Sequence, residues 1–212
     1  MREGLRSFLV GIVAGALLVG APHARAEDVA NGSFEDAETD SDNAYGDLAA
    51  HWGRWGGWMN RESIWKPTHK GKCLMGYHHW QIESDDTSGI YQDIANAPAG
   101  AEFTFSVYAS KDAGTNAEGI ELRIEKVNGG EAVASQLFPV DQIKSSSWTK
   151  LSVTGTNPAE GLRVLVIVKP KPDGVRKGSL KFDDASLSVG GAGVAASEKG
   201  AVSNRATKKN AS

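Results

Sequence analysis

The chain has 212 residues, with 23 Lys and Arg against 26 Asp and Glu, a net charge of −3, and a single cysteine. A charge balance without a basic surplus argues against a nucleic-acid-binding protein, because clustered cations are what bind phosphate backbones. A lone thiol excludes an internal disulfide, so the fold depends on its hydrophobic core, with or without a metal ion.

The N-terminus has the organisation of a secretory signal peptide. Arg2 and Arg6 precede an apolar stretch at 8–20, and Ala-Arg-Ala at 24–26 supplies the small residues that a signal peptidase recognises. The apolar stretch is shorter than the roughly 20 residues of a membrane-spanning helix. We therefore expect cleavage after Ala26, no stable membrane insertion of the mature chain, and a periplasmic or secreted location.

The segment 48–80 differs from the rest of the chain in its aromatic content. It holds five of the six tryptophans and four of the five histidines, interspersed with glycines. Sugars present apolar C–H faces and hydroxyl groups, so a sugar site needs aromatic platforms beside planar hydrogen-bonding groups. The candidate ligand-binding residues are Trp55, Trp58, Trp65, Trp80, His79, Arg61 and Arg123, with Glu121 beside Arg123 on the polar face of a later strand.

Not every tryptophan is expected to meet a ligand, because tryptophan is on average a highly buried residue. Trp52 and Trp148 are predicted to lie in the core. Of Trp55, Trp58, Trp65 and Trp80, about half are expected at a ligand surface, and the sequence leaves open which ones.

Alternating polarity in the second half predicts half-buried strands. Apolar and polar residues interleave at 103–108 and at 120–125, while 162–168 is almost entirely apolar and suits a central strand covered on both sides. A last strand follows at 180–189. Turn residues separate these runs and no segment carries a sustained helical stripe, which together predict an all-β jelly-roll sandwich.

The C-terminal residues 190–212 are predicted to form a disordered, low-complexity tail. They are mainly Gly, Ala, Ser, Asn, Lys and Thr, a composition that buries too little apolar surface to offset ordering entropy. The residues between, 27–189, have the length of one domain. With +2 in the signal peptide and +3 in the tail, the chain total of −3 leaves −8 for this domain.

Five short motifs occur in a consistent order along the predicted domain. They are Asn-Gly-Ser-Phe-Glu at 31–35, Leu48 followed by Trp52, Gly-Ile-Tyr-Gln-Asp-Ile at 89–94 followed by Pro-Ala-Gly at 98–100, Trp-Thr-Lys-Leu-Ser-Val at 148–153 and Phe-Asp-Asp-Ala-Ser-Leu at 182–187. This ordered set resembles the carbohydrate-binding modules of families 4, 9, 16 and 22. The resemblance implies a galactose-binding-domain-like jelly roll of two antiparallel sheets.

The same resemblance implies a structural calcium ion near the paired first and last strands. The matching residues are Glu35 and Asp183, with Asp184 as the next candidate. Calcium takes several hard oxygen ligands, which carboxylates and backbone carbonyls supply. The alternative is that these carboxylates are solvated strand ends or belong to an Asp turn.

These observations predict a secreted, monomeric, non-catalytic module that binds a polysaccharide or other glycan by aromatic stacking and hydrogen bonds. One alternative is a structural or adhesive exoprotein that uses the same fold for protein contacts. Another is a small jelly-roll polysaccharide lyase, for which Tyr77, His79, Arg61 and Tyr108 supply the residue types of proton abstraction. Exposed tryptophans beside a groove would favour glycan binding, and a deep pocket gathering Tyr, His and Arg would favour a lyase.

Overall fold

The computed structural model describes residues 29–39, 47–57, 59–78, 86–127 and 130–190. The signal peptide predicted at 1–26 lies outside these residues, and so does the tail predicted at 190–212 except for Gly190, which is the last residue of a strand. No helix in the described part of the chain is long and apolar enough to cross a membrane. The one helical segment among these residues is a 3-10 turn at Val140–Gln142.

Two antiparallel five-stranded sheets pack face to face, which confirms the predicted all-β jelly-roll sandwich. The first sheet contains, in spatial order, β1 (Gly53–Trp55), β4 (Ser88–Ile94), β9 (Leu162–Pro170), β6 (Ala117–Lys126) and β7 (Ala132–Pro139).

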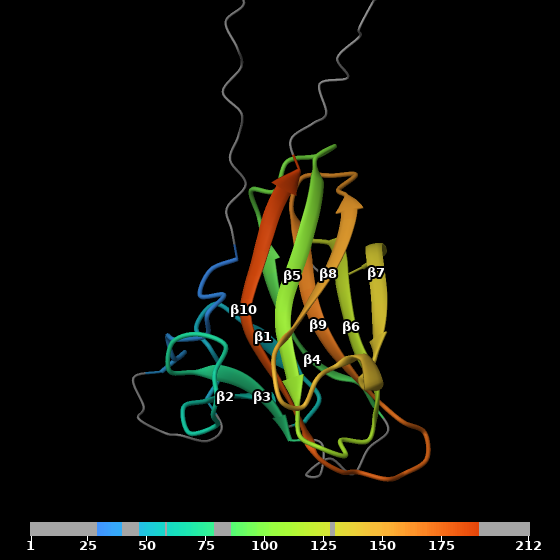
Figure 1. The fold of residues 1–212 in the computed structure, drawn as a ribbon. Helices are drawn as coiled ribbons and strands as arrows, with labels where there is room; N and C mark the ends of the chain where they lie inside the picture. The colour runs from blue at the N-terminus through green and yellow to red at the C-terminus, as the bar shows by residue number, and fades with distance from the viewer. Residues whose placement is uncertain (1–28, 40–46, 58, 79–85, 128–129, 191–212) are drawn as a thin grey trace, which may run out of the picture.

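The second sheet forms the near layer of Figure 1 around its three longest strands. It contains, in spatial order, β2 (Met59–Glu62), β3 (Leu74–His78), β10 (Ser179–Gly190), β5 (Glu102–Lys111) and β8 (Thr149–Thr156).

The core lies between the sheets and follows the alternation of the strands. Phe103, Phe105 and Val107 of β5 are buried there, facing Ile120, Leu122 and Ile124 of β6. Strand β9 points Val164, Val166 and Val168 into the core and Leu165 and Ile167 to its opposite face, where they are also buried. This confirms that β9 is the central strand of its sheet, with buried residues on both faces.

The two tryptophans predicted to be core residues have different positions. Trp52 is buried against Phe34, with ring centroids 5.2 Å apart, and its indole N–H donates to the Asn31 carbonyl. The prediction for Trp148 is wrong, because it is half-buried and lies outside the core cluster. Trp148 shares its side of the chain with Lys150 of β8, whereas Leu151 and Val153 point inward.

The connection between β2 and β3, residues 63–73, lies on the outer face of the second sheet. Trp65 packs against His78 with ring centroids 4.1 Å apart, and its ring lies over Gly76, where a β-carbon would collide with it. Further along, His69 stacks on Tyr108 of β5. This connection therefore adds a layer of aromatic side chains outside the sandwich.

Candidate functional site

A cleft of about 530 Å³ opens on the face of the first sheet that points away from the core. Because side chains alternate along a strand, the cleft residues occupy the positions between the core residues of β4, β9 and β6. The lining residues are Trp55, Thr87, Tyr91, Arg123, Glu125, Arg163, Leu165, Ile167 and Lys169.

The strand register assembles these residues into rows across the sheet. One row runs from Trp55 through Gly89 and Ile167 to Glu121. The next runs from Gly53 through Tyr91 and Leu165 to Arg123, and a third joins Asp93, Arg163 and Glu125. Four strands far apart in sequence thus place aromatic residues at one side of the cleft and charged residues across it.

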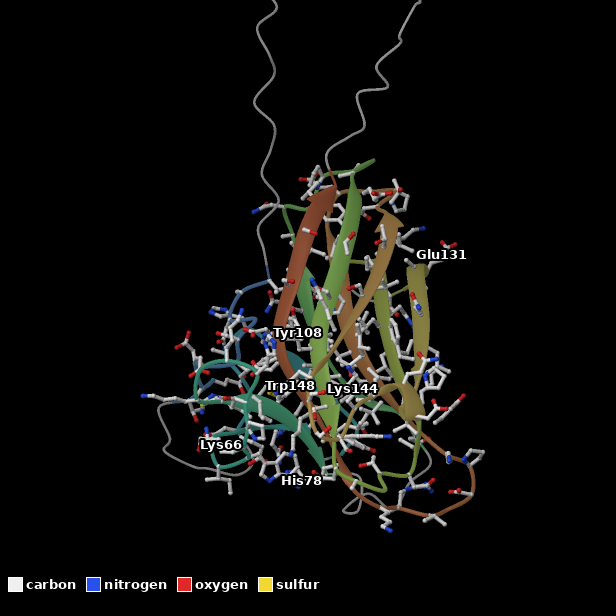
Figure 2. All side chains as sticks on the ribbon, viewed as in Figure 1. Lys66, His78, Tyr108, Glu131, Lys144 and Trp148 are labelled. Carbon is white, nitrogen blue, oxygen red and sulfur yellow. The ribbon has the colours of Figure 1, made fainter. Side chains whose placement is uncertain are left out.

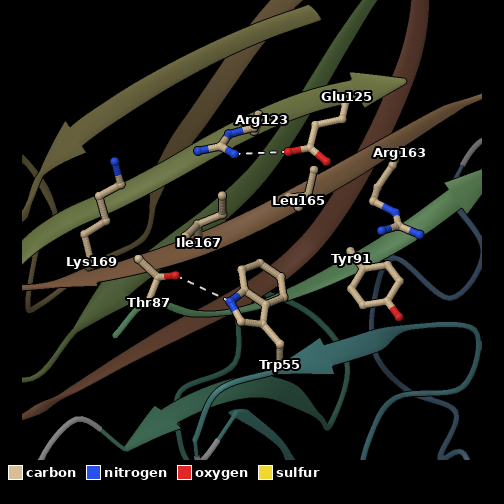
Figure 3. A pocket seen from close by; sticks show the side chains of 9 residues that line it. All are labelled: Trp55, Thr87, Tyr91, Arg123, Glu125, Arg163, Leu165, Ile167 and Lys169. Carbon is tan, nitrogen blue, oxygen red and sulfur yellow. Dashed lines mark hydrogen bonds and ion pairs between the residues drawn. The ribbon is translucent and has the colours of Figure 1, made fainter. Parts of the chain in front are cut away.

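Two aromatic rings form the wall on the β1 and β4 side. Trp55 and Tyr91 are half-buried, with ring centroids 6.3 Å apart and planes inclined by 41°. Each ring lies over a glycine on the neighbouring strand, since a β-carbon at Gly89 would collide with Trp55 and one at Gly53 would collide with Tyr91. The missing side chains let both rings lie against the sheet (Figure 3).

The opposite wall is a network of paired charges centred on Glu121, which is 3% exposed. Its carboxylate accepts hydrogen bonds from Arg123 at 2.7 Å, from Ser135 at 2.5 Å and from Lys169 at 2.6 Å. Arg123 also donates to Glu125 at 3.1 Å. The guanidinium is therefore fixed in orientation between two carboxylates.

The ionisation of this network follows from its contacts. Burial by itself would raise the pKa of Glu121, but hydrogen bonds from Lys169, Ser135 and Arg123 outweigh burial and lower the pKa. Burial likewise works against the charged form of Arg123, and its bonds to Glu121 and Glu125 raise its pKa overall. Glu121 and Arg123 are therefore both ionised at neutral pH.

Arg163 joins the aromatic wall to the charged one. Its guanidinium makes two hydrogen bonds to Asp93, at 2.7 and 2.8 Å, and lies 4.3 Å from the centre of the Tyr91 ring. The bond to Asp93 raises the pKa of Arg163. Each cation that lines the cleft thus has a carboxylate partner within the described residues, so the cleft offers directed hydrogen-bond donors without a surplus of charge.

The residues predicted from sequence are distributed over both sheets. Trp55 and Arg123 line the cleft, while Trp65 and Arg61 belong to the side of the second sheet. Trp58, Trp80 and His79 lie outside the described residues.

The guanidinium of Arg61 is engaged in hydrogen bonds to other parts of the protein. It donates to the carbonyls of Phe34 and Glu35, at 2.9 and 2.5 Å, and to Cys73 Sγ at 2.9 Å. These bonds tie the N-terminal segment to β2 and β3. Cys73 is buried, and this burial raises the pKa of its thiol.

Several cleft residues were missed by the sequence analysis. Arg163 and Lys169 have apolar neighbours on both sides, whereas Tyr91 and Glu125 each follow a buried isoleucine, and this alternation is the signal that places all four on an outer face. Nothing in that alternation shows which strands are adjacent, so their convergence with Trp55 depends on the sheet order.

The candidate calcium ligands are satisfied by backbone amides. Glu35 accepts hydrogen bonds from the N–H groups of Lys72 and Cys73, at 2.8 and 3.0 Å. Asp183 Oδ2 accepts from His69 and Lys70, at 2.7 and 3.2 Å. The described residues contain no group of three or more His, Cys, Asp or Glu side chains able to hold a metal.

The neighbouring groups also favour hydrogen bonds within the protein over a bound cation at these carboxylates. Asp184 Oδ2 lies 2.5 Å from His69 Nδ1, and the ammonium of Lys66 donates to the Lys72 carbonyl at 2.6 Å. Burial raises the pKa of Asp183 to about 6, although the amides of Lys70, Asp184 and His69 lower it. Amide hydrogens directed at the carboxylates do not fit a calcium ion in the same place. Calcium binding stays a prediction.

The residues considered for a lyase do not converge in the described part of the chain. Tyr77 is wholly buried between the sheets, and burial raises its pKa. Tyr108 lies on the outer face of the second sheet, and Arg61 is engaged by backbone carbonyls. A phenol enclosed in the core is out of reach of a substrate.

No family model and no curated protein sequence matches the chain. Among solved structures, an apo-form cyclase from Fischerella sp. aligns with a TM-score of 0.57 at 16% identity, over 79% of this chain and 98% of that one. The CBM22-1 xylan-binding domain of Paenibacillus barcinonensis Xyn10C aligns with a TM-score of 0.50 at 14% identity, over 74% and 91%.

A third neighbour, the K2 cleaved adhesin domain of Lys-gingipain, aligns with a TM-score of 0.51 at 14% identity, over 77% of this chain and 98% of that one. These similarities show that the chain has the jelly-roll fold of carbohydrate-binding modules. A cyclase and an adhesin domain share the fold, so function has to be argued from the site.

Proposed function

We propose that this protein is a secreted, non-catalytic carbohydrate-binding module that takes a glycan chain into the cleft of the first sheet. The observation that carries the proposal is the aromatic wall, in which the half-buried Trp55 ring lies over Gly89 beside Tyr91, whose ring lies between Gly53 and Arg163. The C–H faces of a pyranose ring stack on such rings. The fold, shared with a xylan-binding domain, is consistent with this use.

The charged wall supplies the second part of sugar recognition. Arg123 and Lys169 keep donor groups near the cleft while Glu121 fixes their positions, and Glu125 offers acceptor oxygens. Donors and acceptors already held in place lose little freedom when a sugar hydroxyl binds. Because the cations are internally paired, we infer that the bound part of the glycan is uncharged.

Isothermal titration calorimetry with a panel of neutral soluble polysaccharides and their oligosaccharides tests the proposal. We expect saturable binding to at least one of them. Trp55→Ala should lose this binding. Trp148→Ala should keep it, because Trp148 lies on the outer face of the other sheet. The absence of binding across the panel by a folded protein would overturn it and favour the structural or adhesive alternative. Binding that survives Trp55→Ala would move the site away from this cleft.

A further inference from the structure

A second aromatic cluster lies on the outer face of the second sheet, on the opposite side of the sandwich from the cleft. The His69 ring stacks on Tyr108 with centroids 3.7 Å apart and planes inclined by 17°. Trp148 approaches His69 edge-on at 5.8 Å. Figure 2 shows Tyr108 and Trp148 on the near layer of the molecule, where β5 and β8 pair.

This cluster is built from three separate segments and is held by specific bonds. His69 belongs to the connection between β2 and β3, and Tyr108 belongs to β5. Trp148 is the residue immediately before β8. The backbone N–H of His69 donates to Asp183, and its ring contacts Asp184 at 2.5 Å. The acids of the cluster are therefore used internally to fix His69 between the two other rings.

Positive charge surrounds the cluster without a matching number of free acids. Lys70 is 72% exposed, and its ammonium lies 3.7 Å from Asp184, which already holds His69. Lys144 and Lys150 are exposed, and the Lys150 ammonium lies 6.0 Å from the Tyr108 ring centre. Neither Lys144 nor Lys150 forms an ion pair with another residue of the described ranges.

This local positive charge contrasts with the negative net charge of the whole predicted domain. The predicted domain carries −8, so its net field repels anions at long range. An excess of ammonium groups beside half-buried rings is a local feature, effective within about one Debye length of 10 Å at moderate ionic strength. It fits a partner that brings anionic groups and apolar ring faces to the same place.

We propose that this aromatic and lysine surface, formed by His69, Lys70, Tyr108, Lys144, Trp148 and Lys150, is a second glycan-binding site, selective for a polysaccharide of uronic acids. The accessible face of the half-buried Trp148 ring takes the C–H face of a sugar, and the ammonium groups of Lys70 and Lys150 meet the carboxylates of the polysaccharide. The site is separate from the cleft and goes beyond the proposed function. It can be tested independently of what the cleft binds.

Affinity electrophoresis of the mature chain in gels containing polygalacturonate tests the proposal. The double variant Lys70→Gln/Lys150→Gln should weaken retention by roughly thirtyfold, because each ammonium beside an anionic surface is worth about fivefold in affinity. Trp148→Ala should weaken it as well. The matched control Lys126→Gln/Lys177→Gln removes the same charge elsewhere and should retain wild-type binding. Circular dichroism and the melting midpoint verify that each variant is folded.

Three outcomes would overturn the proposal. They are no retention of the folded wild-type chain by polygalacturonate at low salt, equal weakening by the control pair, and equally tight binding to a single-stranded oligonucleotide. Trp55→Ala separates this proposal from the previous one, because it should abolish binding in the cleft and leave retention by polygalacturonate unchanged.

Discussion

The cleft on the first sheet and the cluster around His69 on the second sheet differ in how their aromatic rings and cations are held. On the first sheet, Arg123 and Arg163 are bound by carboxylates, and the aromatic rings lie over glycines of adjacent strands. On the second sheet, the rings of His69 and Tyr108 pack on one another, and Lys150 has no acidic partner among the described residues. Internal pairing of cations removes the attraction for anions but keeps their hydrogen-bonding directions. The same residue types can thus serve two different ligands.

The largest expected effect on this comparison is that of Trp55→Ala. Removing the ring deletes the aromatic wall of the cleft, and loss of such an anchor at a binding site costs about 2 kcal/mol or more, roughly 30-fold in affinity. Titration calorimetry with the best neutral glycan measures it. Trp148→Ala is the matched control, and an equal loss there would mean that the two faces are not independent.

Gly89→Ala should reduce neutral-glycan affinity by about fivefold or more, although Gly89 has no side chain to bind a ligand. A methyl group at this position would collide with the Trp55 ring and lie 2.5 Å from the Val166 carbonyl oxygen, so it forces the ring off the sheet and also strains the pairing of β4 with β9. A displaced ring stacks less well on a sugar face, at a cost of about 1 kcal/mol or more. Gly130→Ala, where a β-carbon meets nothing within 4 Å, serves as the control and should bind like the wild type.

Glu121→Ala should destabilise the fold by about 1.5–3 kcal/mol, the contribution of a buried hydrogen bond to a charged group. The folded pKa of Glu121 is lower than its ordinary value of 4.5. Its ionised form therefore stabilises the fold at neutral pH, and this contribution disappears as the pH falls below about 4.5. Melting midpoints between neutral and acid pH should drop less steeply in Glu121→Gln than in the wild type. An unchanged pH profile would contradict the assignment.

The smallest expected effect is that of a chelator. Because backbone amides already satisfy Glu35 and Asp183, the melting midpoint should stay the same with EDTA and with added calcium. A bound ion at a thousand times its dissociation constant would add about 4 kcal/mol to the stability. A midpoint that falls with EDTA and recovers with calcium would therefore support the calcium prediction from sequence.

The strands can be predicted from sequence because alternation of apolar and polar side chains is visible in the order of residues. The same alternation, followed one strand further, places Trp148 with Lys150 and away from Leu151 and Val153, which are buried. The prediction of a buried Trp148 failed because it followed the average behaviour of tryptophan and not the phase of its own strand.

The candidate site was only partly accessible from sequence. Trp55 and Arg123 are 68 positions apart in the numbering and meet because β1, β4, β9 and β6 are adjacent in that order. Strand order depends on long-range pairing, which a single sequence does not encode locally. For the same reason the partner of Trp55, Tyr91, could not be identified before the register of β1 and β4 was known.

Gly53 and Gly89 have a consequence for how such modules diverge and how they can be engineered. A survey of residues able to touch a ligand would give these two positions no weight, and a Gly53→Ser descendant, whose new β-carbon has the Tyr91 side chain as its nearest neighbour, would look intact. Its aromatic platform would nonetheless stand at another angle, suited to a differently curved chain. Substituting small side chains beneath a ring is therefore a way to change ligand preference while every ligand-contacting residue is kept.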